Sequence, residues 1–226
     1  MELDSTPIER DVQLDVDTRE VSIQEVGISD VKFPMTLTGL EFDDAAQQTV
    51  SATGSLAVSL ARDLKGIHMS RLIEDLLLQQ EKIRLNGIAS LLHPLKDHQG
   101  AEEASFSMAF DYFLERQAPV SGRTAKQAYA CTYSGRIHGS RLTLSQCVEV
   151  PVTTLCPCSK EISEYGAHNQ RGYVEIELQH FFTVEQEPNV NICLEELIEG
   201  VEAKASSPLY PVLKRTDERY VTMNAY

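Results

Sequence analysis

An alternation of apolar and polar residues with a period of two recurs along this chain and most narrows the folds open to it. It is clearest in the stretch SFSMAFDYFL, from Ser105 to Leu114, where a large apolar side chain stands at every second position. Successive side chains of a β-strand point to opposite faces of a sheet, so this pattern predicts a strand with one buried face. Similar alternation predicts further strands over residues 31–38, 55–64, 129–137, 142–152 and 174–182.

Two segments follow a helical period instead. Apolar residues recur at helical spacing over residues 72–83 and again over residues 194–201. Ser70 is the expected N-cap of the first helix, because its hydroxyl can accept from an unpaired backbone N–H. This helix is expected to extend towards Leu92, where the following His-Pro pair should end it.

The order of the predicted elements divides the chain. Residues 1–20 are acidic and weakly patterned, and we expect a mobile N-terminal arm there. Residues 21–138 read strand, strand, helix, strand, strand, and residues 139–226 begin in the same way but lack the two return strands. We therefore predict an α+β protein of two related antiparallel units with helices on one face. The second unit would have an open sheet edge unless another segment or subunit covered it.

Charge and cysteine content exclude several classes of protein. A formal net charge of -14 argues against a general nucleic-acid binder, which needs a broad basic surface. No apolar run approaches the ~20 residues of a membrane span, and the acidic N-terminus lacks the apolar core of a signal peptide. The five cysteines, an odd number, favour free thiols or metal ligands over a disulfide framework. We therefore expect a cytoplasmic protein.

The segment LCPCSKEISEYGAHNQR, between two predicted strands, is polar, unpatterned and rich in metal-binding groups. It holds Cys156 and Cys158, separated by a single residue, and His168 twelve residues after the first cysteine. Thiolate and imidazole are ligands that zinc prefers. No second cysteine pair supplies the remaining ligands of a closed structural site. The segment therefore favours an open site with three protein ligands and a water.

A candidate third ligand lies on the second predicted helix. Leu194, Ile198 and Glu202 are four residues apart, which places the carboxylate of Glu202 in line with the buried stripe. A carboxylate on an apolar stripe is costly unless it is paired or binds a metal. The alternatives are that Glu202 lies at the margin of the stripe and reaches water, or that it pairs with a lysine.

Basic residues interleave with these candidate ligands in an otherwise acidic chain. Lys160 and Arg171 flank the histidine, and a second group follows Glu202, namely Lys204, Lys214, Arg215 and Arg219. As a set they favour a ligand that carries phosphate, although each alone is typical of a solvated surface. His68 and Arg71 lie just past the end of a predicted strand, where both a functional and a structural role are open.

The pair of cysteines alone leaves a different class of protein open. Cys-x-Cys is a weak motif, and the Cys156-Pro-Cys158 sequence would also permit a non-catalytic metal-binding or redox-sensing protein.

Three motifs in order along the chain, KGIHMSRL, LCPCSKEISEYGAHNQR and YPVLKRTDERYVT, resemble the type IB GTP cyclohydrolase I family, called FolE2. The resemblance extends from about Val21 to Tyr226. It implies a tunnelling fold (T-fold) of two tandem antiparallel-sheet units, assembled into a homotetramer with active sites between subunits. It also implies hydrolysis of GTP to formate and 7,8-dihydroneopterin triphosphate with Zn²⁺ or Mn²⁺. That reaction is the first step towards tetrahydrofolate and, in some bacteria, towards queuosine-type tRNA bases.

The resemblance assigns roles to single residues. The metal ligands would be Cys156, His168 and Glu202, and the metal would lower the pKa of a bound water so that hydroxide can attack C8 of the guanine. Glu218 would anchor the guanine by accepting hydrogen bonds from N1–H and the 2-amino group. Cys158 would form a disulfide with Cys156 under oxidation and so silence the site.

The resemblance also implies where the triphosphate would bind and what the second unit lacks. Lys160, Arg171 and Lys214 are the candidates for the triphosphate, with His68 and Arg71 contributed by a neighbouring subunit. Family members continue past the position of Tyr226 into a further helix and closing strands that bear a catalytic glutamate and histidine. We therefore expect the unit of residues 139–226 to lack its C-terminal strands.

Overall fold

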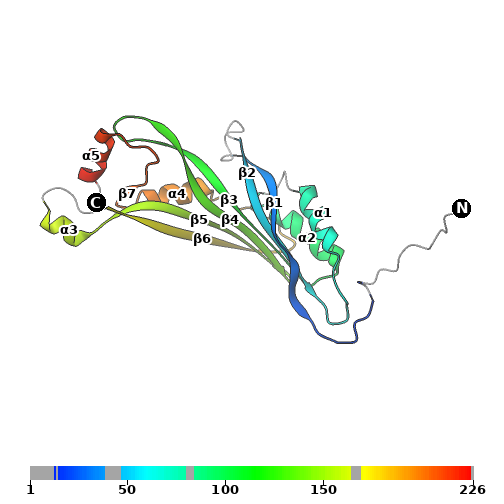
Figure 1. Cartoon of the computed structure of the whole chain (residues 1–226). Coiled ribbons are helices and arrows are strands. Elements are labelled where there is room, and N and C mark those ends of the chain that lie inside the picture. The colour runs from blue at the N-terminus through cyan, green and yellow to red at the C-terminus, as the bar shows by residue number, and fades with distance from the viewer. Residues whose placement is uncertain (1–12, 14, 39–46, 80–83, 164–168, 225–226) are drawn as a thin grey trace, which may run out of the picture.

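One antiparallel sheet runs through the whole molecule (Figure 1). The computed structural model describes residues 13, 15–38, 47–79, 84–163 and 169–224. In these residues the sheet has seven strands, in the order β1-β2-β3-β4-β5-β6, with the short β7 paired to β5. The elements are β1 (Ile23–Thr38), β2 (Gln47–Leu60), α1 (Met69–Gln79), α2 (Ile88–Gln99), β3 (Glu103–Gln117), β4 (Thr124–His138), β5 (Arg141–Leu155), α3 (Pro157–Ile162), β6 (Asn169–Thr183), α4 (Leu194–Glu202), β7 (Ser207–Pro208) and α5 (Arg215–Asn224).

The alternation in the sequence matches the two faces of this sheet. In β3 the side chains at even positions from Ala104 to Tyr112 are buried, and the intervening residues are partly or fully exposed. Each of the six predicted strands is present, all strand pairs are antiparallel, and the helices complete an α+β fold, which confirms that prediction. The strands are longer than the alternation indicates, because pairing continues past the last large apolar side chain. The predicted end of the second strand at residue 64 is wrong, because β2 ends at Leu60.

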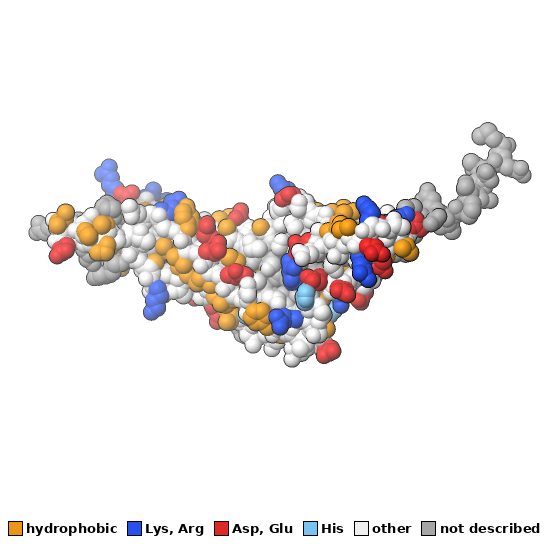
Figure 2. Space-filling model, turned by 90° about the horizontal axis from the view of Figure 1, so that it is seen from below, with side chains coloured by type: hydrophobic (Ala, Val, Ile, Leu, Met, Phe, Trp, Pro, Cys, Tyr) orange, Lys and Arg blue, Asp and Glu red, His pale blue; other side chains and the backbone are white. Residues whose placement is uncertain are grey.

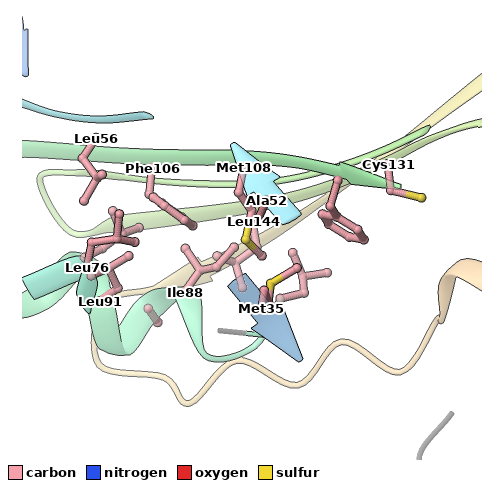
Figure 3. Packing of buried hydrophobic residues seen from close by; sticks show 14 of the residues in the cluster. Met35, Ala52, Leu56, Leu76, Ile88, Leu91, Phe106, Met108, Cys131 and Leu144 are labelled. Atoms are coloured by element: carbon pink, nitrogen blue, oxygen red, sulfur yellow. The ribbon is translucent and has the colours of Figure 1, made fainter. Parts of the chain in front are cut away.

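The hydrophobic core lies between this sheet and its helices. Leu76 of α1 and Ile88 and Leu91 of α2 point towards Phe106 and Leu144 of the sheet (Figure 3). Each of these side chains is at most 2% exposed. Burying such a side chain fully is worth roughly 1.5–3 kcal/mol, so these contacts fix both helices on the sheet. Leu194 and Ile198 of α4 belong to the same continuous core.

The prediction of one long helix starting at a Ser70 cap is wrong. The structure has two helices here, and α1 begins at Met69, so that Ser70 lies in its first turn. The stop expected at the His-Pro pair is also wrong, because Pro94 lies inside α2. A proline in a helix leaves the carbonyl four residues earlier without its bond, and here that residue is the exposed Ser90, where water can bond instead. The buried leucines of α2 outweigh this loss, and the helix ends at Gly100, whose φ of 60° is left-handed.

Part of the expected N-terminal arm is described. Val16 forms an isolated bridge with Leu64, and the N–H of Asp17 donates to the carbonyl of Asp63. Residues 15–20 therefore follow the end of β2, while residues 1–12 and 14 lie outside the described residues.

The face of the sheet away from the helices carries small polar side chains and is hollowed. A cavity of about 600 Å³ is lined in part by Ser55, Ser107, Ser134 and Ser145. Figure 2 shows hydrophobic side chains gathered along the half of the molecule nearer α3. The exposed apolar residues on β6, the lowest strand of that half in Figure 1, are Tyr173, Val174 and Phe181. No helix in the described part of the chain is long and apolar enough to cross a membrane.

Candidate metal and substrate site

The cysteine motif follows the end of β5, which lies at the same end of the sheet as the start of β6. Leu155, the last residue of β5, pairs with Asn169, the first residue of β6. Cys156 follows directly, with extended backbone (φ -84°, ψ 113°), as the N-cap of the short helix α3. His168 immediately precedes Asn169 in the sequence but lies outside the described residues. Strand pairing therefore brings Leu155 and Asn169, the chain neighbours of Cys156 and His168, to the same end of the β5–β6 ladder.

The pairing of β7 with β5 brings Glu202 towards this end of the sheet. Strand β4 pairs with β5 only as far as Glu149, and beyond that point β7 takes its place, with Ser207 opposite Thr153. Glu202 ends α4, only a few residues before β7. The pairing of β7 thus ties the end of α4 to the last residues of β5, just before Cys156.

The carboxylate of Glu202 is largely shielded from solvent and held by two residues of the β3–β4 hairpin. Its Oε1 accepts a hydrogen bond of 2.6 Å from the Tyr129 hydroxyl and one of 3.3 Å from Arg116 Nε. Its Oε2 lies 3.0 Å from Arg116 Nη2, and the side chains of Arg116 and Glu202 are only 18% and 11% exposed. Glu202 is therefore paired, as one of the two alternatives proposed, but its partner is an arginine rather than a lysine.

Arg116 also contacts the tyrosine. Its Nε donates to the Tyr129 hydroxyl over 3.0 Å, and its guanidinium carbon lies 5.6 Å from the centre of the tyrosine ring. The pKa of Tyr129 is raised, first by burial and then by the adjacent Glu202 carboxylate. The phenol is therefore a stable hydrogen-bond donor near neutral pH.

Sequence reasoning missed Arg116 and Tyr129, although a signal for Arg116 exists. The buried positions of β3 include Phe110 and Tyr112, and Arg116 continues their every-second-residue phase past Leu114. An arginine in the buried phase of a strand requires a carboxylate partner. Glu202 on the apolar stripe of α4 is the acidic residue with the matching requirement.

A second tyrosine attaches the start of the same helix. The hydroxyl of Tyr112, the cross-strand partner of Tyr129, donates to a carboxylate oxygen of Glu195. Glu195 and Glu202 lie seven residues apart on α4, which is two helical turns. Glu195, which the sequence placed off the buried stripe, is half-buried through this contact. The cross-strand tyrosine pair therefore fixes α4 at two points.

The candidate guanine anchor, Glu218, lies on α5 beside a buried aspartate. Asp217 is 0% exposed and accepts hydrogen bonds from the N–H groups of Val120 (2.9 Å), Ser121 (2.8 Å) and Lys214 (2.8 Å). The Ser121 hydroxyl adds a fourth bond of 2.7 Å. Asp217 thus caps α5 and fastens it to the turn between β3 and β4, while Glu218 remains exposed. No role for Asp217 was predicted from the sequence.

The structure places two of the basic candidates at this end of the molecule. Arg171 is exposed on β6 opposite Thr153, and Lys214 is exposed at the start of α5. The backbone of Lys160 lies in α3, but its side chain is outside the described residues. Figure 1 shows α3 and α5 together at the end of the sheet where β5 and β6 finish their pairing.

His68 and Arg71 belong to the other end of the molecule. They stand at the start of α1, which Figure 1 shows at the opposite end of the sheet from α3 and α5. The backbone of His68 exchanges two hydrogen bonds with the side chain of Gln99, and Arg71 donates to the carbonyl of His98. One chain therefore does not bring these two residues to the candidate metal ligands.

Among the cysteines, only Cys156 and Cys158 combine the expected motif with access from outside. Cys158 is exposed, and none of the five thiols forms a disulfide. Burial raises the pKa of Cys131 to about 12 and that of Cys193 to about 11, and it also raises the pKa of Cys147. A raised pKa keeps these three thiols protonated near neutral pH.

No complete ligand set can be seen in the part of the chain that the structure describes. In that part, which excludes His168, no three histidine, cysteine, aspartate or glutamate side chains gather closely enough to hold a metal ion.

Comparison with known proteins places the chain among enzymes of one kind. A family model described as type I GTP cyclohydrolase folE2 matches residues 10–226. The protein named GTP cyclohydrolase FolE2 from Geobacter metallireducens is 38% identical over 216 residues, which cover 96% of this chain and 78% of the relative. The protein of the same name from Geobacter sulfurreducens is 39% identical (96% and 79%), and that from Fervidobacterium nodosum is 38% identical over 217 residues (96% and 79%).

Proposed function

This chain belongs to the type I GTP cyclohydrolase FolE2 family, and we propose that it hydrolyses GTP at a metal site held by Cys156, His168 and Glu202. The products of this reaction are formate and 7,8-dihydroneopterin triphosphate, for one water consumed. The matches span nearly the whole chain, so they support the enzyme and not a non-catalytic metal-binding or redox-sensing protein.

The observation that carries the site is the carboxylate of Glu202, whose side chain is only 11% exposed, at the sheet end where Cys156 lies. Its Oε2 makes one ion-pair contact, of 3.0 Å with Arg116 Nη2, and has a second lone pair for another partner. A thiolate and a carboxylate oxygen with a lone pair to spare suit Zn²⁺ or Mn²⁺. When bound, such an ion lowers the pKa of water, which makes hydroxide available near neutral pH.

The residues of the chain supply recognition of the substrate. We propose that Glu218 accepts hydrogen bonds from the guanine, because it is exposed on a helix that Asp217 anchors firmly. Arg171 and Lys214, with Lys160, would bind the triphosphate. In a chain of net charge -14, this group of cations attracts a polyanion to one end of the molecule.

We propose a T-fold made of residues 21–138 and 139–226, in a homotetramer with active sites between subunits. The hollow face free of helices and the exposed apolar residues of the edge strand β6 support contact with other copies of the chain. The distance of His68 and Arg71 from the metal ligands supports their action in a neighbouring subunit's site. The five cysteines without a disulfide support a reducing compartment such as the cytoplasm.

Substitution of each cysteine of the motif tests the proposed metal site. Cys156→Ala should weaken metal binding by more than the roughly 10–100-fold typical of losing an outer-shell partner, and formate release from GTP should be lost with it. Cys158→Ala is the matched control, and it should keep both metal and turnover while becoming insensitive to oxidation. Metal content by elemental analysis and formate release are the measurements. A Cys156→Ala protein with full metal content and turnover would sink the ligand assignment.

A further inference from the structure

The two carboxylate oxygens of Glu202 have different contacts in the protein. Oε1 receives both hydrogen bonds, from Tyr129 and from Arg116 Nε, whereas Oε2 makes a single ion-pair contact of 3.0 Å with Arg116 Nη2. Each carboxylate oxygen has two lone pairs, so both of those on Oε1 are occupied and one on Oε2 remains for another partner.

We propose that Arg116 and Tyr129 are positioning residues that hold the Glu202 carboxylate in one orientation, with Oε2 presented to the metal ion. The inference rests on the proposed function, because it needs Glu202 to be a ligand. A carboxylate at the end of a short helix has several rotamers, and only a fixed one binds a metal without a further loss of side-chain entropy. Hydrogen bonds from outer-shell groups to a ligating carboxylate supply that orientation.

The charge and burial of the three groups agree with this role. Tyr129 is 1% exposed, so its hydroxyl has a fixed place in the core. Arg116 compensates the charge of Glu202, which allows the carboxylate to stay buried before a metal arrives. Both residues come from β3 and β4, which are paired from Glu103 opposite His138 to Gln117 opposite Thr124. The orientation of the ligand is thus set by two strands that are paired over their whole length.

The chain contains a matched control for this role. Tyr112 lies directly across the strand pair from Tyr129 and bonds Glu195 on the same helix. Glu195 is not a candidate ligand. Removing either hydroxyl costs one hydrogen bond between the sheet and α4, and Tyr129→Phe also removes the bond that its hydroxyl accepts from Arg116. Only Tyr129 contacts the carboxylate proposed to bind metal. A purely structural role therefore predicts a larger loss of Tm for Tyr129→Phe but no specific loss of metal affinity.

The experiment compares Tyr129→Phe with Tyr112→Phe in the metal-depleted protein. The measurements are the Kd for Zn²⁺ and for Mn²⁺ and the Tm without metal. We expect both variants to lose Tm, and Tyr129→Phe to lose more because it also gives up the bond from Arg116. We expect Tyr129→Phe to bind metal about tenfold more weakly, and Tyr112→Phe to bind within about twofold of the wild type. An unchanged Kd for Tyr129→Phe, or an equal rise in both variants, would overturn the proposal.

Substitutions of Arg116 provide a second, independent test of the proposal. Arg116→Lys keeps the charge but not the planar fork, so it should bind metal more weakly than wild type and more tightly than Arg116→Met. Tighter metal binding by Arg116→Met than by wild type would mean that the arginine competes with the metal, and this would overturn the proposal. If Arg116→Met does not fold, the tyrosine pair decides the question.

Glu202→Gln separates this inference from the proposed function. If that variant binds metal as tightly as the wild type, Glu202 is not a ligand, and the metal site falls together with this inference. If Glu202→Gln loses the metal while Tyr129→Phe retains wild-type affinity, only the positioning role is wrong.

Discussion

Two neighbouring acidic residues of α5 have opposite environments. One stabilises the fold, and the other is available to bind a ligand. Asp217 is completely buried and accepts four hydrogen bonds, from the turn after β3 and from the start of its own helix. Glu218 is exposed, and its backbone N–H bonds to the carbonyl of Lys214. Asp217 therefore fixes the helix, and the carboxylate of Glu218 stays available for a ligand.

Asp217→Asn tests this division through pH. Burial acts to raise the pKa of Asp217, but the hydrogen bonds from Ser121, Lys214 and Val120 outweigh it and hold the pKa well below its usual value. A group with a depressed folded-state pKa stabilises the protein above its unfolded pKa, about 3.9 for aspartate, and this contribution is lost as pH falls below it. We expect Asp217→Asn to lower Tm by several degrees at pH 7, and the difference from wild type to shrink below about pH 4.

The neighbouring residue Glu218 provides the control for this experiment. Glu218→Gln should leave Tm unchanged and weaken GTP binding with no loss of metal. A Tm difference for Asp217→Asn that stays constant from pH 7 to pH 3 would show that the charge of Asp217 does not stabilise the fold.

At the same scale, the sequence identified some site residues and not others for physical reasons. Glu202 was predictable because helical spacing reports burial, and a buried carboxylate requires a partner. Arg116 stands in the buried phase of β3, but pairing it with Glu202 requires knowing that α4 packs on that end of β3. Asp217 accepts mainly backbone N–H groups, which every sequence has, so nothing in the residue types of the turn indicated it.

Among the elements, the contact of α2 with β4 depends on a residue that has no side chain. A Cβ placed on Gly135 would lie 2.5 Å from Ile88 Cγ2 and 3.0 Å from Leu92 Cδ1. The helix therefore packs directly on the backbone of the strand. Gly200, inside α4, has open space around the same position.

These two glycines predict changes of opposite sign. Gly135→Ala should lower the free energy of unfolding by roughly 1–3 kcal/mol, because the packed core must move to admit a methyl group. Gly200→Ala should raise it by roughly 0.5–1 kcal/mol, because alanine is the better helix former. Urea denaturation of both variants measures the difference. Equal stability of the two variants would contradict the close packing of α2 on β4.

The strands were predictable and the helix boundaries were not. Alternation is a local signal that burial on one face imposes on every strand of this sheet, so residues such as Phe106 and Met108 indicate it directly. The limits of α1 and α2 depend instead on packing against the sheet, which overrides both the Ser70 cap and the break expected at Pro94. The short helix α3 after Cys156 has too few residues to show a period.

In the whole molecule, the β3–β4 hairpin connects the two carboxylates of the proposed site. Arg116 and Tyr129 hold Glu202, and the turn at Val120 and Ser121 holds Asp217 beside Glu218. The metal ligand and the guanine anchor thus take their positions from one piece of sheet. The sequence could not show this, because the residues of β7 that close the arrangement against β5 are only Ser207 and Pro208.

The most direct test of metal-dependent GTP hydrolysis by this chain is formate release from GTP by metal-depleted protein, measured before and after Zn²⁺ or Mn²⁺ is added. We expect no release without metal. We expect added metal to restore release, with one formate for each 7,8-dihydroneopterin triphosphate formed. Release that does not depend on metal, or a saturated metal site with no formate, would contradict it.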